Sequence, residues 1–248
     1  MRRTVAVIIA AATAALALSA CGPTASKTGS APAGQPKAAV AANPADAIAA
    51  AYDKTLAANT AKFSALLDTT ISGNKISLTG DGSIQFNPLA GDSTLKGKGT
   101  DVHIITIGRD VYIQGTDKKW SKLDTSKTSG SSNNPVDYLG FLKGVTGPVT
   151  STGTTDVHGS PATGYKVTVD FAKAVKNSPG GANSLLQSVQ SGGITTAPID
   201  IWLDNQGRLA QIKYRFDAKA RGADLVSDGT VAFFDYGTPV TVTAPRVG

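Results

Sequence analysis

The sequence predicts an α+β fold in which helices cover the apolar face of a large antiparallel β-sheet. Three observations support this prediction. Most of the chain after residue 59 alternates apolar and polar residues, which is typical of strands with one buried face. Short turns separate the strands, so neighbouring strands are expected to run antiparallel. Three stretches have helical spacing instead, and the apolar face of a sheet requires such cover.

The first helical stretch, NPADAIAAAYDKTLAAN, opens the folded part of the chain. Asn43 can accept a hydrogen bond from the first turn of a helix, and Pro44 suits the first helical position. Apolar side chains then recur at intervals of three and four, which predicts a helix with one buried face. That face is formed by Ile48, Ala51, Tyr52, Thr55 and Leu56.

About six strands are expected after this helix. In KISLTGDGSIQF the alternation places Gly80 and Gly82 on the apolar face, and HIITIGRDVYIQG predicts a hairpin that turns at Gly108-Arg109-Asp110. KKWSKLD adds a further strand. The apolar face of KISLTGDGSIQF also carries Ile76, Leu78, Ile84 and Phe86.

The second half of the chain has the same alternation, in TGYKVTVDF, APIDIWLDNQGRLAQIKYRF and LVSDGTVAFFDY. The second of these predicts a hairpin with a turn at Asp204-Asn205-Gln206-Gly207 and one polar side. Trp202 is expected on the convex face or at an edge. The apolar faces are expected to carry Tyr165, Val167, Val169 and Phe171, then Ile199, Ile201 and Leu203, then Ala210, Ile212, Tyr214 and Phe216.

Two interior stretches return to helical spacing. NPVDYLGFLKGV has apolar residues near helical spacing, namely Val136, Leu139, Phe141, Leu142 and Val145. GGANSLLQSVQSGG does the same with Leu185, Leu186 and Val189, bounded by glycines. The predicted order is therefore a helix, about six strands, a helix, two strands, a helix and about four strands.

The first twenty residues have the layout of a bacterial secretory signal. Two arginines precede an apolar run over residues 5–18, which is too short to span a membrane. The next residues, up to Cys21, resemble a lipobox, in which the cysteine becomes the N-terminus and carries a diacylglyceryl group. Cys21 is the only cysteine of the chain, so we expect a lipidated residue rather than a chance cysteine after a plain secretory signal. The predicted cleavage site consists of Leu18, Ser19 and Ala20.

The predicted organisation is a signal peptide over 1–20, a lipidated cysteine with a flexible linker over 21–44, and one domain over 45–248. The linker is rich in Ala, Gly, Pro and Ser, and it cannot bury enough surface to fold. Two acyl chains on Cys21 would hold the protein stably at the extracytoplasmic face of the plasma membrane. The formal net charge of +6 falls to +4 without the two signal arginines, and lysines and aromatics do not cluster. We therefore expect no nucleic-acid partner.

Four segments in order resemble the actinobacterial LppX/LprAFG lipoprotein family, and the resemblance covers about residues 45–240. The segments are DVYIQGTDKKWSKLD, PVDYLGFLKGV, TGTTDVHGSPATGYKVTVD and PIDIWLDNQGRLAQIKYRF. The resemblance implies a strongly curved half-barrel similar to LolA and LolB, with about three helices across its concave side. It also implies an apolar cavity for acylated lipids or glycolipids. An acidic position of the family lies in a stretch that reads Thr154-Thr155-Asp156 here. Cavity-lining positions vary among members, so the identity of the ligand does not carry over.

The candidate lining residues are those expected to face inward from strands and helices. Gly80 and Gly82 would leave room there, although strand glycines also serve tight bending of a filled core. A cavity and a filled core are both compatible with the residues, and the resemblance favours the cavity. The candidates are Ile76, Leu78, Ile84, Phe86, Leu139, Leu142, Val167, Val169, Leu185, Leu186, Ile199, Ile201, Ile212 and Tyr214.

The sequence contains no recognisable catalytic set, metal site or cofactor motif. His103 and His158 each lie in a strand-like segment and are expected to be surface residues. DNQG at 204–207 lacks most ligands of a calcium loop and fits a turn better. Trp120 is expected to pack on the domain, with a place at the membrane interface as the alternative. We expect no enzyme, no cofactor and no metal.

Two functional hypotheses follow. The first is a membrane-anchored carrier that binds an acylated lipid or glycolipid and passes it to another envelope component, such as a transport protein. The second is an envelope interaction or sensor domain that has a filled core and an exposed apolar patch for a protein partner. An envelope hydrolase is a weaker third, because no nucleophile and base are evident.

Overall fold

The computed structural model describes residues 43–123, 134–178, 184–220 and 223–248. The predicted signal peptide, its cleavage residues Leu18, Ser19 and Ala20, the lipidation site Cys21 and most of the linker lie outside the described residues. None of the helices in the described ranges has the length and apolar content that a membrane crossing requires.

The first helix, α1 (Pro44–Ala57), begins where the sequence predicts. The side chain of Asn43 accepts a hydrogen bond from the backbone N–H of Ala45 at 3.1 Å, and Pro44 takes the first helical position. Both features stabilise the first turn, because its N–H groups have no partner within the helix. Its buried face consists of Ile48, Ala51, Tyr52 and Thr55, as expected.

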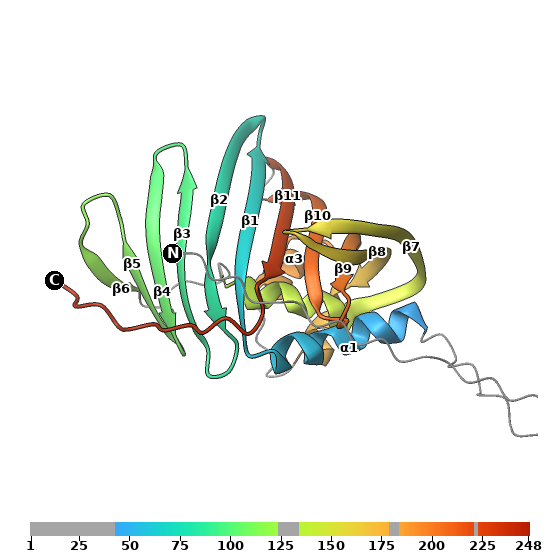
Figure 1. Ribbon diagram of the computed structural model, residues 1–248. Helices are drawn as coiled ribbons and strands as arrows, with labels where there is room; N and C mark the ends of the chain where they lie inside the picture. Colours follow the sequence, from blue (N-terminus) through green and yellow to red (C-terminus); the bar gives the residue numbers. More distant parts are fainter. Residues whose placement is uncertain (1–42, 124–133, 179–183, 221–222) are drawn as a thin grey trace, which may run out of the picture. The chain divides into compact units, whose positions relative to one another are not determined.

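The strands that follow form one open antiparallel sheet (Figure 1). Its eleven strands within the described residues have the order β6-β5-β4-β3-β2-β1-β11-β10-β9-β8-β7. Each pair of neighbours is antiparallel, so the prediction of an antiparallel α+β fold is confirmed. The bounds are β1 (Thr60–Ile71), β2 (Asn74–Gln85), β3 (Ala90–Gly97), β4 (Thr100–Ile107), β5 (Asp110–Gln114), β6 (Trp120–Leu123), β7 (Val145–Val157), β8 (Ser160–Asp170), β9 (Thr196–Asp204), β10 (Leu209–Ala220) and β11 (Ala223–Phe234).

Three helical segments besides α1 lie between the strands, where two were predicted. The additional one is α2 (Phe171–Asn177), which begins directly after β8. Asp170 is its N-cap and accepts a hydrogen bond from the backbone N–H of Lys173 at 2.9 Å. Phe171 was predicted to continue the strand, because its position also fits the period of two. The last helix of the described residues, α3 (Ser184–Ser191), lies where it was predicted.

The segment η1 (Pro135–Gly144) is a 3-10 helix rather than an α-helix. Its buried residues fall into rows of three-residue spacing, with Tyr138 and Phe141 in one row and Leu139 and Leu142 in the next. This spacing suits three residues per turn. Gly144 ends it, and a side chain there would collide with Ala174 and Val169. Close packing against β8 and α2 therefore accompanies the tighter winding.

The helices pack on one face of the sheet, which we call the inner face. Phe141 lies at the centre, with ring centroids of Tyr138, Phe171, Tyr214 and Phe216 at 5.8 to 6.1 Å. These rings come from η1, α2 and β10, so one aromatic cluster joins the helices to the sheet. The helices make their main contacts with each other and with β7, β8 and β10.

A second, smaller apolar cluster lies on the opposite, outer face. It contains Val157, Ala162, Ala210 and Ala232, with Trp202 packed against it. The prediction that Trp202 lies opposite the buried face of its strand is confirmed. The prediction that Ala210 shares the face of Ile212 is wrong, because a register shift between residues 209 and 211 turns Ala210 to the other side.

The sequence predicted about four strands after the last helix, and the described residues have three, β9 to β11. The predicted turns at residues 108–110 and 204–207 are both present. In the second turn the carboxylate of Asp204 accepts hydrogen bonds from the backbone N–H groups of Gln206 and Arg208, each at 2.9 Å. These hydrogen bonds are those of an Asp at a turn.

Candidate functional site

The register of β1 to β6 separates apolar from charged side chains. Directly paired residues of antiparallel strands share a face, so Ala65, Gly80 and Leu95 lie on the inner face in one row. Across these six strands the inner positions of described side chains carry no charge. All charged side chains of the strands project from the outer face: Lys62, Asp68, Lys75, Asp81, Asp92, Lys96, Asp101, Asp110 and Lys122.

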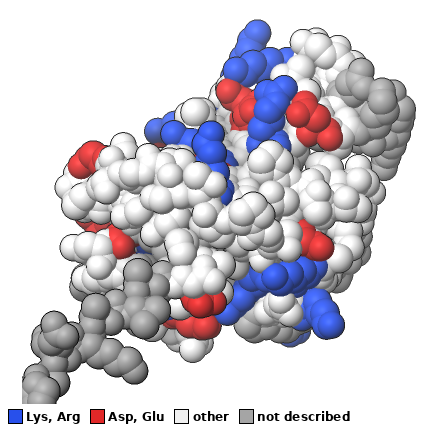
Figure 2. All heavy atoms as spheres, turned by 90° about the vertical axis from the view of Figure 1, so that its right-hand side faces the viewer, with Lys and Arg blue, Asp and Glu red and all other residues white. Residues whose placement is uncertain are grey.

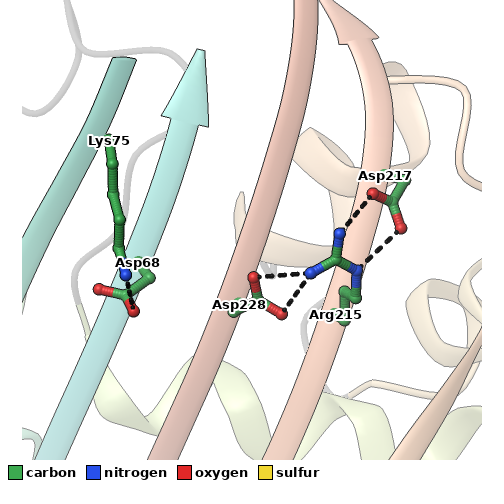
Figure 3. Close-up of polar contacts among 5 residues, drawn as sticks. All are labelled: Asp68, Lys75, Arg215, Asp217 and Asp228. Atoms are coloured by element: carbon green, nitrogen blue, oxygen red, sulfur yellow. Dashed lines mark hydrogen bonds and ion pairs between the residues drawn. The ribbon is translucent and has the colours of Figure 1, made fainter. Parts of the chain in front are cut away.

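The outer face continues as a row of ion pairs across β10, β11, β1 and β2 (Figure 3). Arg215 lies between two carboxylates, 3.2 Å from Asp217 and 3.1 Å from Asp228. Asp228 is paired in register with Asp68, whose carboxylate binds the ammonium group of Lys75 at 2.9 Å. The hydrogen bond from Lys75 holds the pKa of Asp68 below its ordinary value. These pairs are solvent-exposed, so they mark the wet side of the sheet more than they stabilise it.

Charge is dispersed at the β7–β8 end of the fold. Figure 2 shows that side from the right of Figure 1, with basic and acidic side chains in small separate groups and broad uncharged areas between them. Neither sign dominates this face.

A small pocket lies on the inner face, between β1 to β4 and the start of η1. Its volume is about 40 Å³, whereas sites for whole small molecules commonly have about 300–1,000 Å³. Its walls are mainly apolar. The lining residues are Phe63, Ala65, Leu67, Gly80, Ser93, Thr94, Leu95, Ile104, Pro135, Tyr138 and Val231.

Gly80 and Gly82, which the sequence placed on the inner face, have different roles. A β-carbon built at Gly80 would make ordinary contacts, 3.5 Å from Leu95 Cδ1 and 3.8 Å from Ala65 Cβ. A β-carbon at Gly82 would overlap the carbonyl oxygen of Asp92 and lie 2.7 Å from Ser93 Cβ. Gly82 is therefore required by the close approach of β3. Gly80 is not required by packing, and its lack of a side chain leaves the pocket open.

The pocket continues into a wider apolar surface, which we call the inner wall. It consists of the inner-facing apolar side chains of β1 to β6 that are not fully buried, and helices make none of their main contacts with β2 to β6. Ile76 is the most exposed member, at 52%. The inner wall comprises Ala65, Leu67, Ile71, Ile76, Leu78, Leu95, Val102, Ile104, Val111, Ile113 and Leu123.

Two phenols lie beside the pocket. The hydroxyls of Tyr138 and Tyr214 are 3.3 Å apart, and their rings stack with centroids 5.8 Å apart. Burial raises the pKa of both phenols, so both stay protonated at neutral pH. Gly229 makes room for this stack, because a β-carbon there would overlap the ring of Tyr214.

Most of the predicted lining residues lie in the main core. None of them lines the described pocket, so their role in a cavity stays a prediction. Leu185 packs against this core, Leu78 is half-buried and Ile76 is exposed. The core members are Ile84, Phe86, Leu139, Leu142, Val167, Val169, Leu186, Ile199, Ile201, Ile212 and Tyr214.

The two histidines lie on the outer face. His158 Nε2 is 2.9 Å from the hydroxyl of Ser64, and its ring stacks on Phe234 at 3.9 Å. The described residues give His158 no carboxylate partner, which a Ser-His-Asp set requires. His103 binds Asp92 at 2.6 Å and packs on the ring of Trp120. Among the described residues, no three His, Cys, Asp or Glu side chains are grouped as metal ligands would be.

Sequence reasoning missed most of the pocket. Ser93, Thr94 and Leu95 come from DSTLKG, whose single apolar residue did not suggest a strand of the site. Ala65 and Leu67 come from β1, which pairs both with β2 and with the distant β11. The alternation of residues 63, 65 and 67 was the available signal.

Two solved structures have a similar fold. LprF from Mycobacterium bovis matches with a TM-score of 0.54 at 12% identity, over 82% of this chain and 97% of that chain. The lipoprotein LppX from Mycobacterium tuberculosis matches with a TM-score of 0.50 at 18% identity, over 80% of this chain and 99% of that chain. Both proteins therefore share the fold of this chain over nearly their whole length.

Comparison by sequence alone finds similarity over a smaller part of the chain. No family model matches the chain. An uncharacterized 31.2 kDa protein in the rplA-rplJ intergenic region of Streptomyces griseus is 35% identical over 103 residues. The match covers 40% of this chain and about a third, 32%, of that relative.

Proposed function

Because this chain has the fold of LppX and LprF, we propose that it is a lipid-carrying lipoprotein of the LppX/LprAFG type. In this proposal Cys21 is diacylated and anchors the protein to the extracytoplasmic face of the bacterial plasma membrane. The open sheet is a curved half-barrel whose concave side is the inner wall. The protein holds the acyl part of a lipid or glycolipid and passes it to an envelope transport protein. It is not an enzyme.

The observation that carries this proposal is the uncharged inner face of six consecutive strands. A sheet with two wet faces has no need to segregate every charge to one side. Burial of an acyl chain contributes about 0.8 kcal/mol per methylene, so ten methylenes contribute about 8 kcal/mol. That corresponds to a dissociation constant of about 1 μM before the entropy costs of binding.

The size of the pocket decides how the ligand is held. A volume of about 40 Å³ takes the end of an acyl chain and not a whole lipid. The rest of the chain then lies along the inner wall, between Leu95 in β3 and Leu123 in β6. The polar head group stays outside, because the wall offers no charge to pair with it.

The test compares the native and denatured masses of the full mature chain, purified from an actinobacterial host. We expect a non-covalent adduct that is lost on denaturation and a covalent increment that remains on Cys21. Ile76→Asp places a charge on the inner wall and should abolish the adduct. Leu66→Asp is the matched control, because Leu66 is similarly exposed, at 47%, but projects from the outer face of the neighbouring strand.

If Ile76→Asp and Leu66→Asp both fold and carry the same amount of the lipid adduct, the inner wall is not the lipid site. A bare mass for the unmodified chain, also after incubation with envelope lipids, would favour the second candidate function. That candidate is an envelope interaction or sensor domain, and the small volume of the pocket together with the exposed Ile76 favours it. The inner wall would then be the surface that a protein partner covers.

A further inference from the structure

We propose that one edge of the sheet docks on an anionic lipid bilayer. This edge, which we call the turn edge, consists of the turns that join β1 to β2, β3 to β4 and β5 to β6, over residues 71–76, 96–101 and 115–119. Its use in lipid transfer rests on the proposed function. The docking itself is a separate property with its own test.

The three turns share an edge because of the topology. In an antiparallel meander, alternate hairpins turn at the same end of the sheet, and β1 to β6 are such a meander. Figure 1 shows these turns along the upper border, at the ends of β1–β2, β3–β4 and β5–β6. The turns between β2 and β3 and between β4 and β5 lie at the opposite end.

The turn edge carries basic side chains without acidic partners. Among the described residues, Lys96, Lys98, Lys118 and Lys119 take part in no ion pair. Two carboxylates share the same turns, and one of them, Asp117, accepts a hydrogen bond from the backbone N–H of Lys119 at 3.1 Å. The excess positive charge at this edge complements phosphate groups.

The same edge carries exposed apolar side chains. Ile71 is 40% exposed and Ile76 is 52% exposed, and together they are two of the four large apolar residues that are exposed in the described chain. Both project from the inner face, at either side of the β1–β2 turn. Exposed isoleucines at one turn, on the same edge as the lysines of the next two turns, fit the boundary of a bilayer, where apolar side chains enter below charged head groups.

The opposite edge lacks this combination. Its described turns contain Arg109 beside Asp110, and none of the exposed large apolar residues lies there. The difference between the two edges gives the protein a preferred orientation at a membrane. It places the exposed end of the inner wall in contact with the bilayer, so that an acyl chain can pass from lipid to wall without crossing water.

The experiment measures co-sedimentation of residues 21–248, the predicted mature chain, in the form Cys21→Ala, with vesicles. One set contains equal parts of phosphatidylglycerol and phosphatidylcholine, and the other contains phosphatidylcholine alone. A lysine near an anionic surface strengthens binding by about fivefold. The variant Lys96→Gln, Lys98→Gln, Lys118→Gln and Lys119→Gln should therefore bind anionic vesicles at least a hundredfold more weakly.

A matched control removes the same charge elsewhere. Lys54→Gln, Lys166→Gln, Lys176→Gln and Lys213→Gln change lysines that also take part in no ion pair among the described residues. This control should retain most of the binding. Ile71→Ser with Ile76→Ser should weaken binding to anionic vesicles, whereas Leu66→Ser on the outer face should not.

Equal losses in the two lysine variants would overturn the proposal, because they would show that only net charge matters. Equal binding to both vesicle types, or no binding to either, would also overturn it. The readout needs no lipid loading. If the protein binds vesicles but its native mass shows no lipid adduct, docking at the turn edge is supported and the carrier function is refuted. If it carries a lipid adduct but does not bind vesicles, docking is refuted and the carrier function is supported.

Discussion

Replacing Gly80 tests directly whether the pocket receives the end of an acyl chain. Gly80→Leu adds four carbons at a position where a β-carbon makes only ordinary contacts, so the new side chain grows into the pocket of about 40 Å³. The ligand then loses the burial of about two methylenes. At about 0.8 kcal/mol each, this weakens binding by roughly 15-fold.

Two neighbouring variants serve as controls. Gly80→Ala adds one carbon at ordinary contact distance and should stabilise the fold by about 0.5–1 kcal/mol, since alanine loses less backbone entropy than glycine. Gly82→Ala forces β3 to shift away from β2 and should cost about 1–3 kcal/mol of folding free energy.

The assay is a fluorescence titration with a labelled palmitate, combined with chemical denaturation of each variant. We expect weaker binding for Gly80→Leu and near-normal binding for Gly80→Ala, both in folded protein. A folded Gly80→Leu variant that binds palmitate as tightly as the unmodified chain would refute the assignment of this pocket. A destabilised Gly80→Ala variant would refute the argument that no packing requirement fixes this glycine.

Three further outcomes are expected from the core. Phe141→Ala removes the centre of the aromatic cluster and should lower the free energy of unfolding by about 3–5 kcal/mol, and a loss below 1 kcal/mol in denaturant titration would contradict that placement. Gly229→Ala should cost about 1–3 kcal/mol because its methyl group meets the ring of Tyr214, and Tyr214→Phe should leave that cost intact. Burial raises the pKa of Tyr138 and Tyr214, so folding stability should be full below pH 10 and fall as the pH rises further, because the unfolded chain then releases phenolic protons that the fold retains. If the phenolate absorbance reaches its full value at a pH where the protein is still folded, the two phenols are not buried.

The sidedness of the sheet was predictable from the sequence. A period of two fixes which residues share a face once the strands are known, and the row through Gly80 and Ile84 follows from KISLTGDGSIQF alone. The hairpin at Asp204 was equally predictable, because its turn residues lie between two alternating segments.

The features that sequence reasoning missed depend on local irregularity or on distant pairing. Phe171 fits a strand by period, and only the cap at Asp170 marks the start of α2. The bulge at Ala210 breaks a regular alternation without any change in composition. Two of the three pocket residues of β3, Ser93 and Thr94, are small and polar, and they line an apolar site because β1, β2 and η1 enclose them.

The order of strands also has a consequence for how this chain folds. Within β1 to β6, and within β7 to β11, every pairing joins strands that are consecutive in sequence, so each half can form from pairings of strands close in sequence. A single junction, β1 with β11, joins the halves and brings together the two ends of the domain, where Lys62 and Asp235 form an ion pair across 173 positions. Closing so long a loop is the slow step expected of non-local pairing. The inner wall can therefore exist before the junction forms, whereas the pocket cannot, because Val231 of β11 lines it beside Phe63 of β1.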